Sequence, residues 1–214
     1  MSLQVTEIFY SIQGESTNAG RPCVFIRLTG CPLRCTWCDT EYAFHGGKQM
    51  TLHQILGEVR SHGCRLVEVT GGEPLAQSKC IDLLHILLDE DYEVMLETSG
   101  ALSIDEVPHK VQVIMDLKCP DSGEESKNRW SNIEHLDEND ELKFVISSRE
   151  DFDWSMRAIS ERNLARRVRA ILFSPVHGKL EPTKLAEWMK EAHAPARLQL
   201  QLHKQLWPDV EAGV

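Results

Sequence analysis

Short apolar runs alternate along this chain with longer amphipathic stretches. The runs predict strands, whereas stretches in which apolar residues recur every three or four positions predict helices. Strands are expected over 23–28, 65–69, 92–96, 111–117, 141–146, 169–173 and 197–201, and helices over 51–62, 79–88, 151–161 and 183–191. The connection between 96 and 111 has room for only a short helix.

Two of the expected helices carry local signals. Thr51 and Gln54 stand at the spacing of a capping box, in which each side chain satisfies a backbone amide of the first helical turn. The helix over 79–88 has an apolar face that predicts the side packed on a sheet, formed by Ile81, Leu84, Leu87 and Leu88.

Strand and crossover, repeated some six times, predict an α/β fold with a parallel sheet and right-handed connections. A complete eight-fold barrel usually needs around 250 residues, more than this chain has. We therefore expect a single domain over 1–214 that forms an incomplete, modified (βα)6 partial barrel, with a doubly wound open sheet as the second choice. Residues 121–140 are acidic and aperiodic, which predicts a loop with at most one helical turn.

Net charge and cysteine content limit the partners, the location and the thiol chemistry that we expect for this protein. The 214 residues carry 33 acidic and 23 basic side chains, a formal net charge of −10. This charge argues against binding to nucleic acid or to an anionic membrane over a broad surface. No basic segment followed by an apolar one opens the chain, and no apolar run approaches about 18 residues, so a cytoplasmic location is expected. Seven cysteines, an odd number, predict reduced thiols.

Residues suited to a site gather where the predicted strands end. In parallel β/α folds these ends lie at one edge of the sheet, where chemistry collects. The segments are 30–40 (GCPLRCTWCDT), 70–74 (TGGEP), 97–100 (ETSG), 116–120 (DLKCP) and 174–178 (SPVHG). Five such segments at successive strand ends predict one shared pocket, although each alone could simply be a loop.

Cys31, Cys35 and Cys38 form the sharpest signal. Three thiolates on one loop are too few for a closed structural zinc site, which normally takes four ligands. They suit a [4Fe-4S] cluster whose fourth iron is free to bind a small molecule. Zinc with Cys23 or His45 as the fourth ligand is the alternative. The remaining thiols, Cys64, Cys80 and Cys119, lack partners at ligand spacing and are expected to be packed or incidental.

The C-x-x-x-C-x-x-C loop followed by Gly-Gly-Glu-Pro resembles the signature of radical S-adenosylmethionine enzymes. The resemblance implies that the free iron binds the methionine end of S-adenosylmethionine, which is cleaved to a 5′-deoxyadenosyl radical. Gly71 and Gly72 are expected to let the backbone approach the methionine ammonium group, where a Cβ would obstruct. Trp37 could wall the adenine or shield the cluster from water.

A narrower resemblance covers most of the chain. Residues 7–15 (EIFYSIQGE), 20–27 (GRPCVFIR), 38–40 (CDT) and 202–206 (LHKQL) are similar to the 7-carboxy-7-deazaguanine synthase family. This resemblance implies a carbon–nitrogen lyase that converts 6-carboxy-5,6,7,8-tetrahydropterin to 7-carboxy-7-deazaguanine with loss of ammonia, in queuosine biosynthesis. It also implies a homodimer, a magnesium ion, a reducing electron donor such as flavodoxin and no nucleic-acid or membrane partner.

The same resemblance implies roles for individual residues. Arg27 would pair with the substrate carboxylate and Thr40 would bind Mg²⁺, while Glu15, Glu97 and His203 are the other candidates for catalysis. The expected substrate contacts are Ile12, Gln13, Gly14, Arg27 and Thr70. The expected cofactor contacts are Trp37, Cys38, Asp39, Gly71, Gly72, Lys118, Ser174, Pro175, Val176 and His177.

Several of these residues also have a simpler interpretation. Strand alternation equally allows Arg27 to point to solvent, and Glu15 to be a solvated acid near the chain start. Glu97 ends an apolar strand, where a carboxylate needs a partner or a role. His203 beside a leucine-rich strand could be a packed core or edge residue, and Thr40 a turn residue.

Three features depart from the family pattern. The cluster loop keeps the short spacing, whereas some relatives carry an insertion there. The segment 207–214 continues past the His-Lys pair, and Val214, Asp209 or Glu211 could take the place of a terminal carboxylate at the substrate. Asp116-Leu117 precedes Lys118 where relatives have Ser-Pro. The rival function is a glycyl-radical activating enzyme that acts on a partner protein and needs an open docking face.

Overall fold

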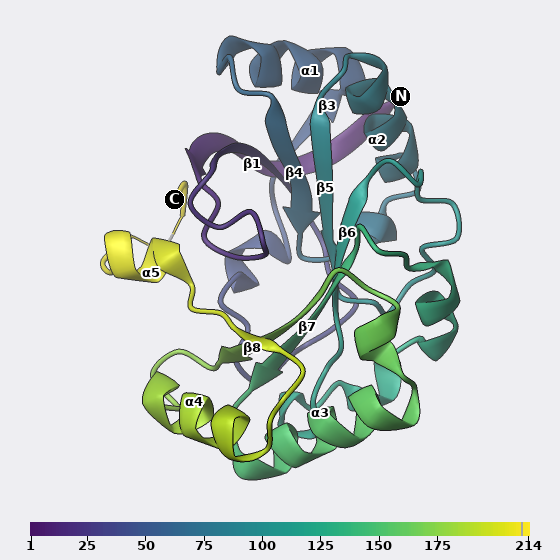
Figure 1. Ribbon diagram of the computed structural model, residues 1–214. Coiled ribbons are helices and arrows are strands. Elements are labelled where there is room, and N and C mark those ends of the chain that lie inside the picture. Colours follow the sequence, from purple (N-terminus) through teal and green to yellow (C-terminus); the bar gives the residue numbers. More distant parts are fainter. Residues whose placement is uncertain (211) are drawn as a thin grey trace.

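A nine-stranded sheet organises the described part of the chain, which in this computed structural model comprises residues 1–210 and 212–214 (Figure 1). Its strands are β1 (Ser2–Ile12), β2 (Pro22–Leu28), β3 (Lys48–Thr51), β4 (Leu66–Gly71), β5 (Glu93–Thr98), β6 (Gln112–Asp116), β7 (Glu141–Ile146), β8 (Ala170–Pro175) and β9 (Arg197–Leu198). The α-helices are α1 (Leu52–Ser61), α2 (Cys80–Asp89), α3 (Arg149–Glu161), α4 (Pro182–Glu191) and α5 (Leu202–Leu206).

The strand order distinguishes the two folds that the sequence allows. It runs β3-β1-β2-β4-β5-β6-β7-β8-β9, with every neighbour from β2 to β9 parallel and β1 antiparallel to both β2 and β3. A doubly wound sheet reverses its order near the middle, whereas here the parallel strands follow chain order throughout. The sheet stays open, with β3 and β9 at its edges. The predicted partial barrel is confirmed.

The helices divide between the two sides of the curved sheet. Figure 1 shows α1 to α4 along its outer side, whereas α5 lies on the open side with the C-terminus, near the loop that follows β1. None of the helices within the described residues is both long and apolar enough to cross a bilayer.

Two buried cores fill the space between the sheet and the outer helices. One is built on β2, β4 and β5 with α1 and α2 and includes Ile26, Val69 and Leu84. The other is built on β6 to β8 with α3 and includes Phe144, Phe152 and Phe173, which pack edge to face. A third, smaller cluster lies on the inner side of the sheet and consists of Cys23, Phe25, Leu66, Met95 and Ile114.

The local helix signals had different outcomes. The capping box is confirmed, because the Gln54 amide donates to Thr51 Oγ1 at 3.2 Å and the Thr51 amide to Gln54 Oε1 at 2.8 Å. The predicted face of α2 is partly wrong: the buried positions are Cys80, Leu83, Leu84 and Leu87. This stripe overlaps the predicted one and includes a cysteine, a small apolar residue that packs as well as leucine here.

Other differences concern the chain ends and the acidic segment. Strands β1 and β3 were not among the predicted elements. The strand predicted over 197–201 is reduced to the two residues of β9, and the segment around His203 is helical rather than a leucine-rich strand. The predicted loop over 121–140 contains three short 3₁₀ segments, Pro120–Ser122, Glu125–Lys127 and Trp130–His135.

Candidate active site

One polar side chain from each of six parallel strands faces the inside of the partial barrel. They are Arg27 on β2, Thr70 on β4, Glu97 on β5, Asp116 on β6, Lys143 on β7 and Ser174 on β8. The strand register brings these positions together, since Arg27 pairs with Thr70 and Asp116 with Lys143. Successive side chains on a strand alternate between faces, so every second residue points inward. The inner apolar cluster lies nearer the starts of the strands. The six polar residues therefore form a separate layer nearer the strand ends.

This polar layer lines a cavity of about 480 Å³, a volume typical of small-molecule sites. All the residues proposed from the sequence line it: Ile12, Gln13, Gly14, Glu15, Arg27, Cys31, Cys35, Trp37, Cys38, Asp39, Thr40, Thr70, Gly71, Gly72, Glu97, Lys118, Ser174, Pro175, Val176, His177 and His203. The prediction of one shared pocket at the strand ends is therefore confirmed. The individual roles of these residues remain predictions.

Cys31, Cys35 and Cys38 are free, half-buried thiols at the rim of this cavity. Burial raises the pKa of each thiol. Their loop is held to the scaffold at two points, because the Glu73 amide donates to Gly30 O at 2.8 Å and the Thr36 amide to Ser122 O at 3.0 Å. The donor set and its anchoring fit an iron–sulfur cluster with three protein ligands.

The zinc alternative finds no support. Among the described residues, no three His, Cys, Asp or Glu side chains converge closely enough to hold a single metal ion. Cys23 is fully buried among apolar side chains, His45 is exposed, and neither lines the cavity. A four-iron cluster binds each cysteine through a different iron, so its three thiolates need not meet at one point.

Gly71 and Gly72 pack directly against the cysteine loop and the strand before it. A Cβ on Gly72 would lie 2.5 Å from Gly30 O and 2.7 Å from Cys31 Cβ, and a Cβ on Gly71 would lie 2.5 Å from Leu28 O. Protein atoms therefore require glycine at both positions. This reason differs from the predicted approach to a cofactor ammonium group, which stays a prediction.

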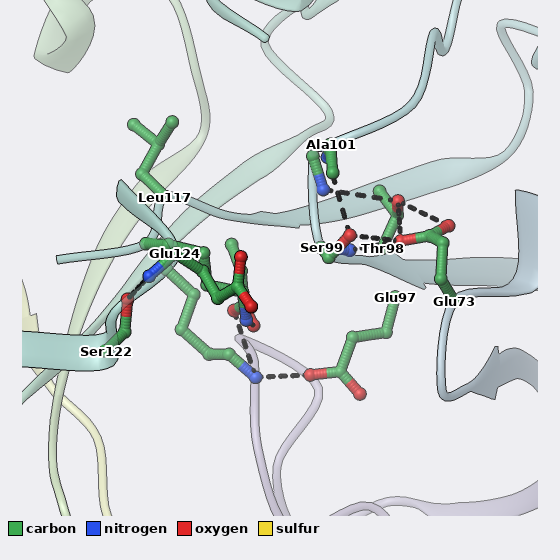
Figure 2. A network of polar contacts seen from close by, with 12 residues as sticks. Glu73, Glu97, Thr98, Ser99, Ala101, Leu117, Ser122 and Glu124 are labelled. Carbon is green, nitrogen blue, oxygen red and sulfur yellow. Dashed lines mark hydrogen bonds and ion pairs between the residues drawn. The ribbon is translucent and has the colours of Figure 1, made fainter. Parts of the chain in front are cut away.

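The side chain of Glu73 fixes the turn that follows Gly71 and Gly72. Its fully buried carboxylate accepts hydrogen bonds from the Ser99 amide at 2.7 Å, the Leu75 amide at 2.9 Å and Thr98 Oγ1 at 2.9 Å. Figure 2 shows the Glu73 carboxylate facing Thr98 and Ser99, while the Glu97 side chain extends away from them. The glutamate of the Gly-Gly-Glu-Pro segment thus ties the turn after β4 to the end of β5.

Lys143 is the centre of the polar layer. The residue is 5% exposed, and its Nζ lies 2.9 Å from Glu15 Oε2 and 3.3 Å from Asp116 Oδ1 and also pairs with Glu97. These carboxylates raise the pKa of Lys143 well above its ordinary value, although burial alone would lower it. The lysine is therefore a fixed positive charge.

The two glutamates differ in their response to this charge. Burial would raise the pKa of Glu15, but Lys143 and the amide of Gln201 lower it below its ordinary value. For Glu97, burial outweighs the lysine and the pKa is raised. Glu15 is therefore not the solvated acid of the simpler interpretation, and Glu97 has in Lys143 the partner that its position requires.

Glu68 lies deeper than the charged layer, level with Phe25 and Met95 of the inner apolar cluster. It is 4% exposed and accepts a hydrogen bond of 2.5 Å from Gln13 Nε2. Burial, with Glu97 and Glu15 nearby, raises the pKa of Glu68 well above its ordinary value. This side chain is thus a carboxylic acid that favours its neutral form.

Arg27 points into the cavity and not to solvent, so the solvent-facing interpretation is wrong. Its side chain is 16% exposed, and Nε donates to Glu7 Oε1 at 2.8 Å. The guanidinium group lies between the rings of Phe9 and Tyr42, 5.9 Å from each ring centre. Among the described residues, its two terminal nitrogens have no hydrogen-bond partner, so both can donate to one planar anion such as a carboxylate.

The C-terminal segment closes the open side against the loop after β1. The Leu202 amide donates to Gly14 O at 3.0 Å, and a Cβ on Gly14 would lie 2.4 Å from His203 Nδ1. Lys204 Nζ pairs with Asp39 Oδ2 at 2.8 Å. Burial lowers the pKa of His203, so its imidazole favours the neutral form.

The alternatives for the last residues are partly resolved. Val214 lines the cavity, whereas Asp209 is exposed and is not among the lining residues. Glu211 lies outside the described residues.

Sequence reasoning missed Lys143 and Glu68 as site residues and treated Asp116 only as a departure from the family pattern. A signal for them exists. Each is a charged residue inside or at the end of an otherwise apolar strand, in LVEVTG, QVIMD and ELKFVI. Because a buried charge needs a partner, such residues on successive strands predict a shared ionic layer.

Comparison with known proteins assigns the chain to a family. The model of the radical SAM superfamily matches residues 25–161. The 7-carboxy-7-deazaguanine synthase of Chlorobaculum tepidum is 44% identical over 215 residues, covering 99% of this chain and 97% of the relative. That of Koribacter versatilis is 41% identical over 226 residues, covering 99% of this chain and all of the relative.

Solved structures agree on the fold. The crystal structure of QueE from Escherichia coli superposes with a TM-score of 0.72 at 23% identity, covering 94% of each chain. Streptococcus suis SuiB bound to S-adenosylmethionine gives a TM-score of 0.56 at 13% identity over 80% of this chain and 44% of SuiB. The chain belongs to the radical SAM superfamily and, within it, to the 7-carboxy-7-deazaguanine synthase family.

Proposed function

We propose that the chain converts 6-carboxy-5,6,7,8-tetrahydropterin to 7-carboxy-7-deazaguanine with loss of ammonia, a step towards queuosine. Besides family membership, one observation carries the proposal: a single cavity is lined both by three free thiols and by Arg27, Thr70 and Glu97. A cofactor held by the thiols and a small substrate held by the strands would therefore share one space.

The rival function, activation of a glycyl radical on a partner protein, is not favoured. Such an enzyme needs room for a polypeptide loop at its cluster. The cavity has the volume of a small-molecule site, and α5 with the loop after β1 covers its open side.

Cys31, Cys35 and Cys38 would hold the [4Fe-4S] cluster. S-adenosylmethionine would lie against Trp37, Asp39, Gly71, Gly72, Lys118 and the segment from Ser174 to His177. When bound, the two groups supply a carbon-centred radical, a chemistry that no side chain of this chain provides. The protein's own contribution is a fixed geometry, and it includes Lys118, whose Nζ is held by Asp116 Oδ2 at 2.6 Å.

The substrate would be oriented by a positively charged side chain and by two carboxylates that line the same cavity. The two free terminal nitrogens of Arg27 would bind the pterin carboxylate. Backbone groups of 12–14 and the hydroxyl of Thr70 would contact the ring system, and neutral His203 would cover it from α5. The carboxylates of Glu15 and Glu97 would accept hydrogen bonds from N–H groups of the pyrimidine ring.

A magnesium ion would bind at Thr40. Thr40 Oγ1 and Asp39 Oδ1 lie 3.0 Å apart at the cavity, and Mg²⁺ prefers oxygen ligands while keeping several waters or substrate oxygens. Thr40→Val removes the oxygen at nearly constant volume and should abolish most of the stimulation of activity by magnesium, whereas Thr40→Ser should keep it. A Thr40→Val enzyme with the wild-type magnesium dependence would make Thr40 a turn residue only.

Four further properties belong to the proposal. They are a single radical SAM domain over 1–214, a homodimeric assembly, a cytoplasmic location and reduction by an electron donor such as flavodoxin. Sedimentation equilibrium of the purified protein tests the dimer, and reduction kinetics with flavodoxin test the donor.

The activity itself is tested with the anaerobically reconstituted protein. With S-adenosylmethionine, a reductant, Mg²⁺ and 6-carboxy-5,6,7,8-tetrahydropterin, mass spectrometry should detect 7-carboxy-7-deazaguanine together with one ammonia per product. Protein that carries its cluster and cleaves S-adenosylmethionine, but leaves the pterin unchanged, would contradict the proposal.

A further inference from the structure

Four charged side chains from separate parts of the chain meet inside the barrel, and we refer to them as the Lys143 cluster: Glu15, Glu97, Asp116 and Lys143. The carboxylates come from the loop after β1, from β5 and from β6, and the lysine from β7. Within the described residues, Lys143 is the one cation in salt-bridge distance of Glu15 and of Glu97. Removing a charge from water is costly, so a cluster this buried must be held together by its own contacts.

Glu15 and Glu97 are each held at both carboxylate oxygens. Lys143 contacts one oxygen of each residue. Of the remaining oxygens, Glu15 Oε1 accepts from Gln201 Nε2 at 2.9 Å and Glu97 Oε2 accepts from Thr70 Oγ1 at 3.2 Å. Both residues line the cavity, and a carboxylate oxygen can accept more than one hydrogen bond. Glu15 Oε2 also accepts from Gln199 Nε2 at 3.0 Å, so the free acceptor capacity lies on Glu15 Oε1 and on the Glu97 carboxylate. Both carboxylates contact the same lysine nitrogen and are therefore fixed close together.

We propose that Lys143 is a positioning residue that sets Glu15 and Glu97 as a paired acceptor for the N–H-rich edge of a 2-amino-4-oxopyrimidine ring. The inference rests on the proposed function and extends it to the part of the substrate remote from the carboxylate. Arg27 and the paired acceptor then select a planar heterocycle that has a carboxylate at one end and adjacent N–H donors at the other. A ring without the amino group would leave buried carboxylates unpaired and should be rejected strongly.

A positioning role of Lys143 can be distinguished from a packing role, because only its charge affects the protonation of the neighbouring carboxylates. The titratable and charged groups around it are Glu15, Glu68, Glu97, Asp116 and Lys118, with Arg27, Asp39 and His203 beyond them. Without the lysine, the pKa values of both Glu15 and Glu97 rise, because burial is then opposed by fewer favourable contacts. Protonated carboxyls lose acceptor capacity, so substrate affinity should fall on acidification at a higher pH than in the wild type.

The test compares wild type, Lys143→Met and Lys143→Arg, each reconstituted anaerobically. Exposed Lys190 on α4 offers the matched control Lys190→Met. The dissociation constant for 6-carboxy-5,6,7,8-tetrahydropterin is measured without reductant across a pH series from about 5.5 to about 9. Iron content and S-adenosylmethionine affinity are measured in the same preparations.

We expect Lys143→Met to raise the pterin dissociation constant about tenfold or more at neutral pH, and to move the loss of affinity on acidification up by about one pH unit. Iron content and S-adenosylmethionine affinity should stay at wild-type levels, as should every property of Lys190→Met. Unchanged pterin affinity and an unchanged pH profile in Lys143→Met would overturn the inference.

Lys143→Arg keeps the proposal testable if the methionine variant does not fold. It retains the charge in a different geometry, so the pH profile should stay in place while the dissociation constant rises severalfold. An arginine variant with wild-type affinity would contradict the positioning role. Wild-type protein that binds no carboxytetrahydropterin would instead contradict the proposed function.

Discussion

Arg27 shows how one side chain is prepared for an anion before the anion is present. Glu7 holds the Nε end at 2.8 Å, and the rings of Phe9 and Tyr42 flank the guanidinium group. These contacts fix the plane of the group, so little conformational entropy is lost when a carboxylate meets the two free nitrogens.

Arg27→Lys should therefore weaken substrate binding even though the charge is kept. A lysine cannot offer two parallel N–H donors, and hydrogen bonds between charged groups are worth roughly 1.5–3 kcal/mol, so we expect the pterin dissociation constant to rise about tenfold or more. S-adenosylmethionine should still be cleaved slowly, without product. Isothermal titration measures the binding and chromatography the cleavage.

The matched control is Arg21→Lys, because the Arg21 side chain is 46% exposed in its ion pair with Glu93. It should leave pterin affinity unchanged. Wild-type affinity in Arg27→Lys would show that Arg27 does not bind the substrate.

Glu68 makes stability depend on pH. Its pKa in the folded protein is raised by burial and by the nearby Glu97 and Glu15, so its contribution to stability is complete below the unfolded pKa and is lost as pH rises through the folded pKa. Glu68→Gln, which cannot ionise, should gain stability relative to the wild type as pH rises, by about 1 kcal/mol or more between acid and alkaline conditions. Urea unfolding across the pH range measures the difference.

Exposed Glu106 provides the comparison, because Glu106→Gln makes the same substitution at the surface, where a single charge contributes little to stability. A stability difference between Glu68→Gln and the wild type that does not change with pH would contradict the raised pKa of Glu68.

At the scale of elements, β1 explains why part of the fold was missed. The apolar alternation along it changes phase: Leu3 and Val5 occupy odd positions, whereas Ile8, Tyr10 and Ile12 occupy even ones. The register of β1 against β2 shifts between Val5 and Glu7, so the break in the pattern is a bulge. A bulged strand that buries only two side chains gives no continuous period of two.

The end of the sheet was mispredicted for a different reason. After β9, Gln199 accepts a hydrogen bond from the Ser16 amide at 2.6 Å and donates to Glu15 Oε2 at 3.0 Å. These side-chain contacts with the loop after β1 replace further strand pairing, and the chain then turns into α5. Contacts between residues so far apart in sequence leave no local pattern, whereas the strand-end motifs that define the cavity are local and were predicted.

The docking of α5 against Gly14 can be tested directly. In Gly14→Ala the new Cβ would lie 2.4 Å from His203 Nδ1, so α5 must move away from the cavity. We expect faster hydrogen exchange over 202–206 and pterin affinity lowered about tenfold, since one face of the site is displaced. Hydrogen-exchange mass spectrometry and titration measure the two effects.

The control is Gly57→Ala within α1, where a Cβ would meet no atom within 4 Å. That change should stabilise the protein by about 0.5–1 kcal/mol, the helix preference of alanine over glycine, without altering exchange over 202–206. Wild-type exchange and affinity in Gly14→Ala would contradict the proposed role of α5.

At the scale of the molecule, function depends on how the sheet separates two environments. Its outer side packs on helices through two apolar cores, and its inner side carries the small apolar cluster, the charged layer and the loops with the cysteines. The parallel order, and hence the gathering of strand ends, followed from the alternation of strands and helices in the sequence. The ionic layer did not, because its members are single residues on strands whose relative register only the folded sheet defines.

Cys31, Cys35 and Cys38 are expected to hold the group that carries the chemistry of this cavity. Iron content, the electron paramagnetic resonance signal of the reduced protein and formation of 7-carboxy-7-deazaguanine should be measured together in wild type, Cys35→Ala and Cys64→Ala. Cys64 is a partly buried thiol that does not line the cavity, so Cys64→Ala should keep the cluster and the activity. Cys35→Ala should lose both, because only two protein ligands remain. Wild-type iron content and turnover in Cys35→Ala would contradict the account.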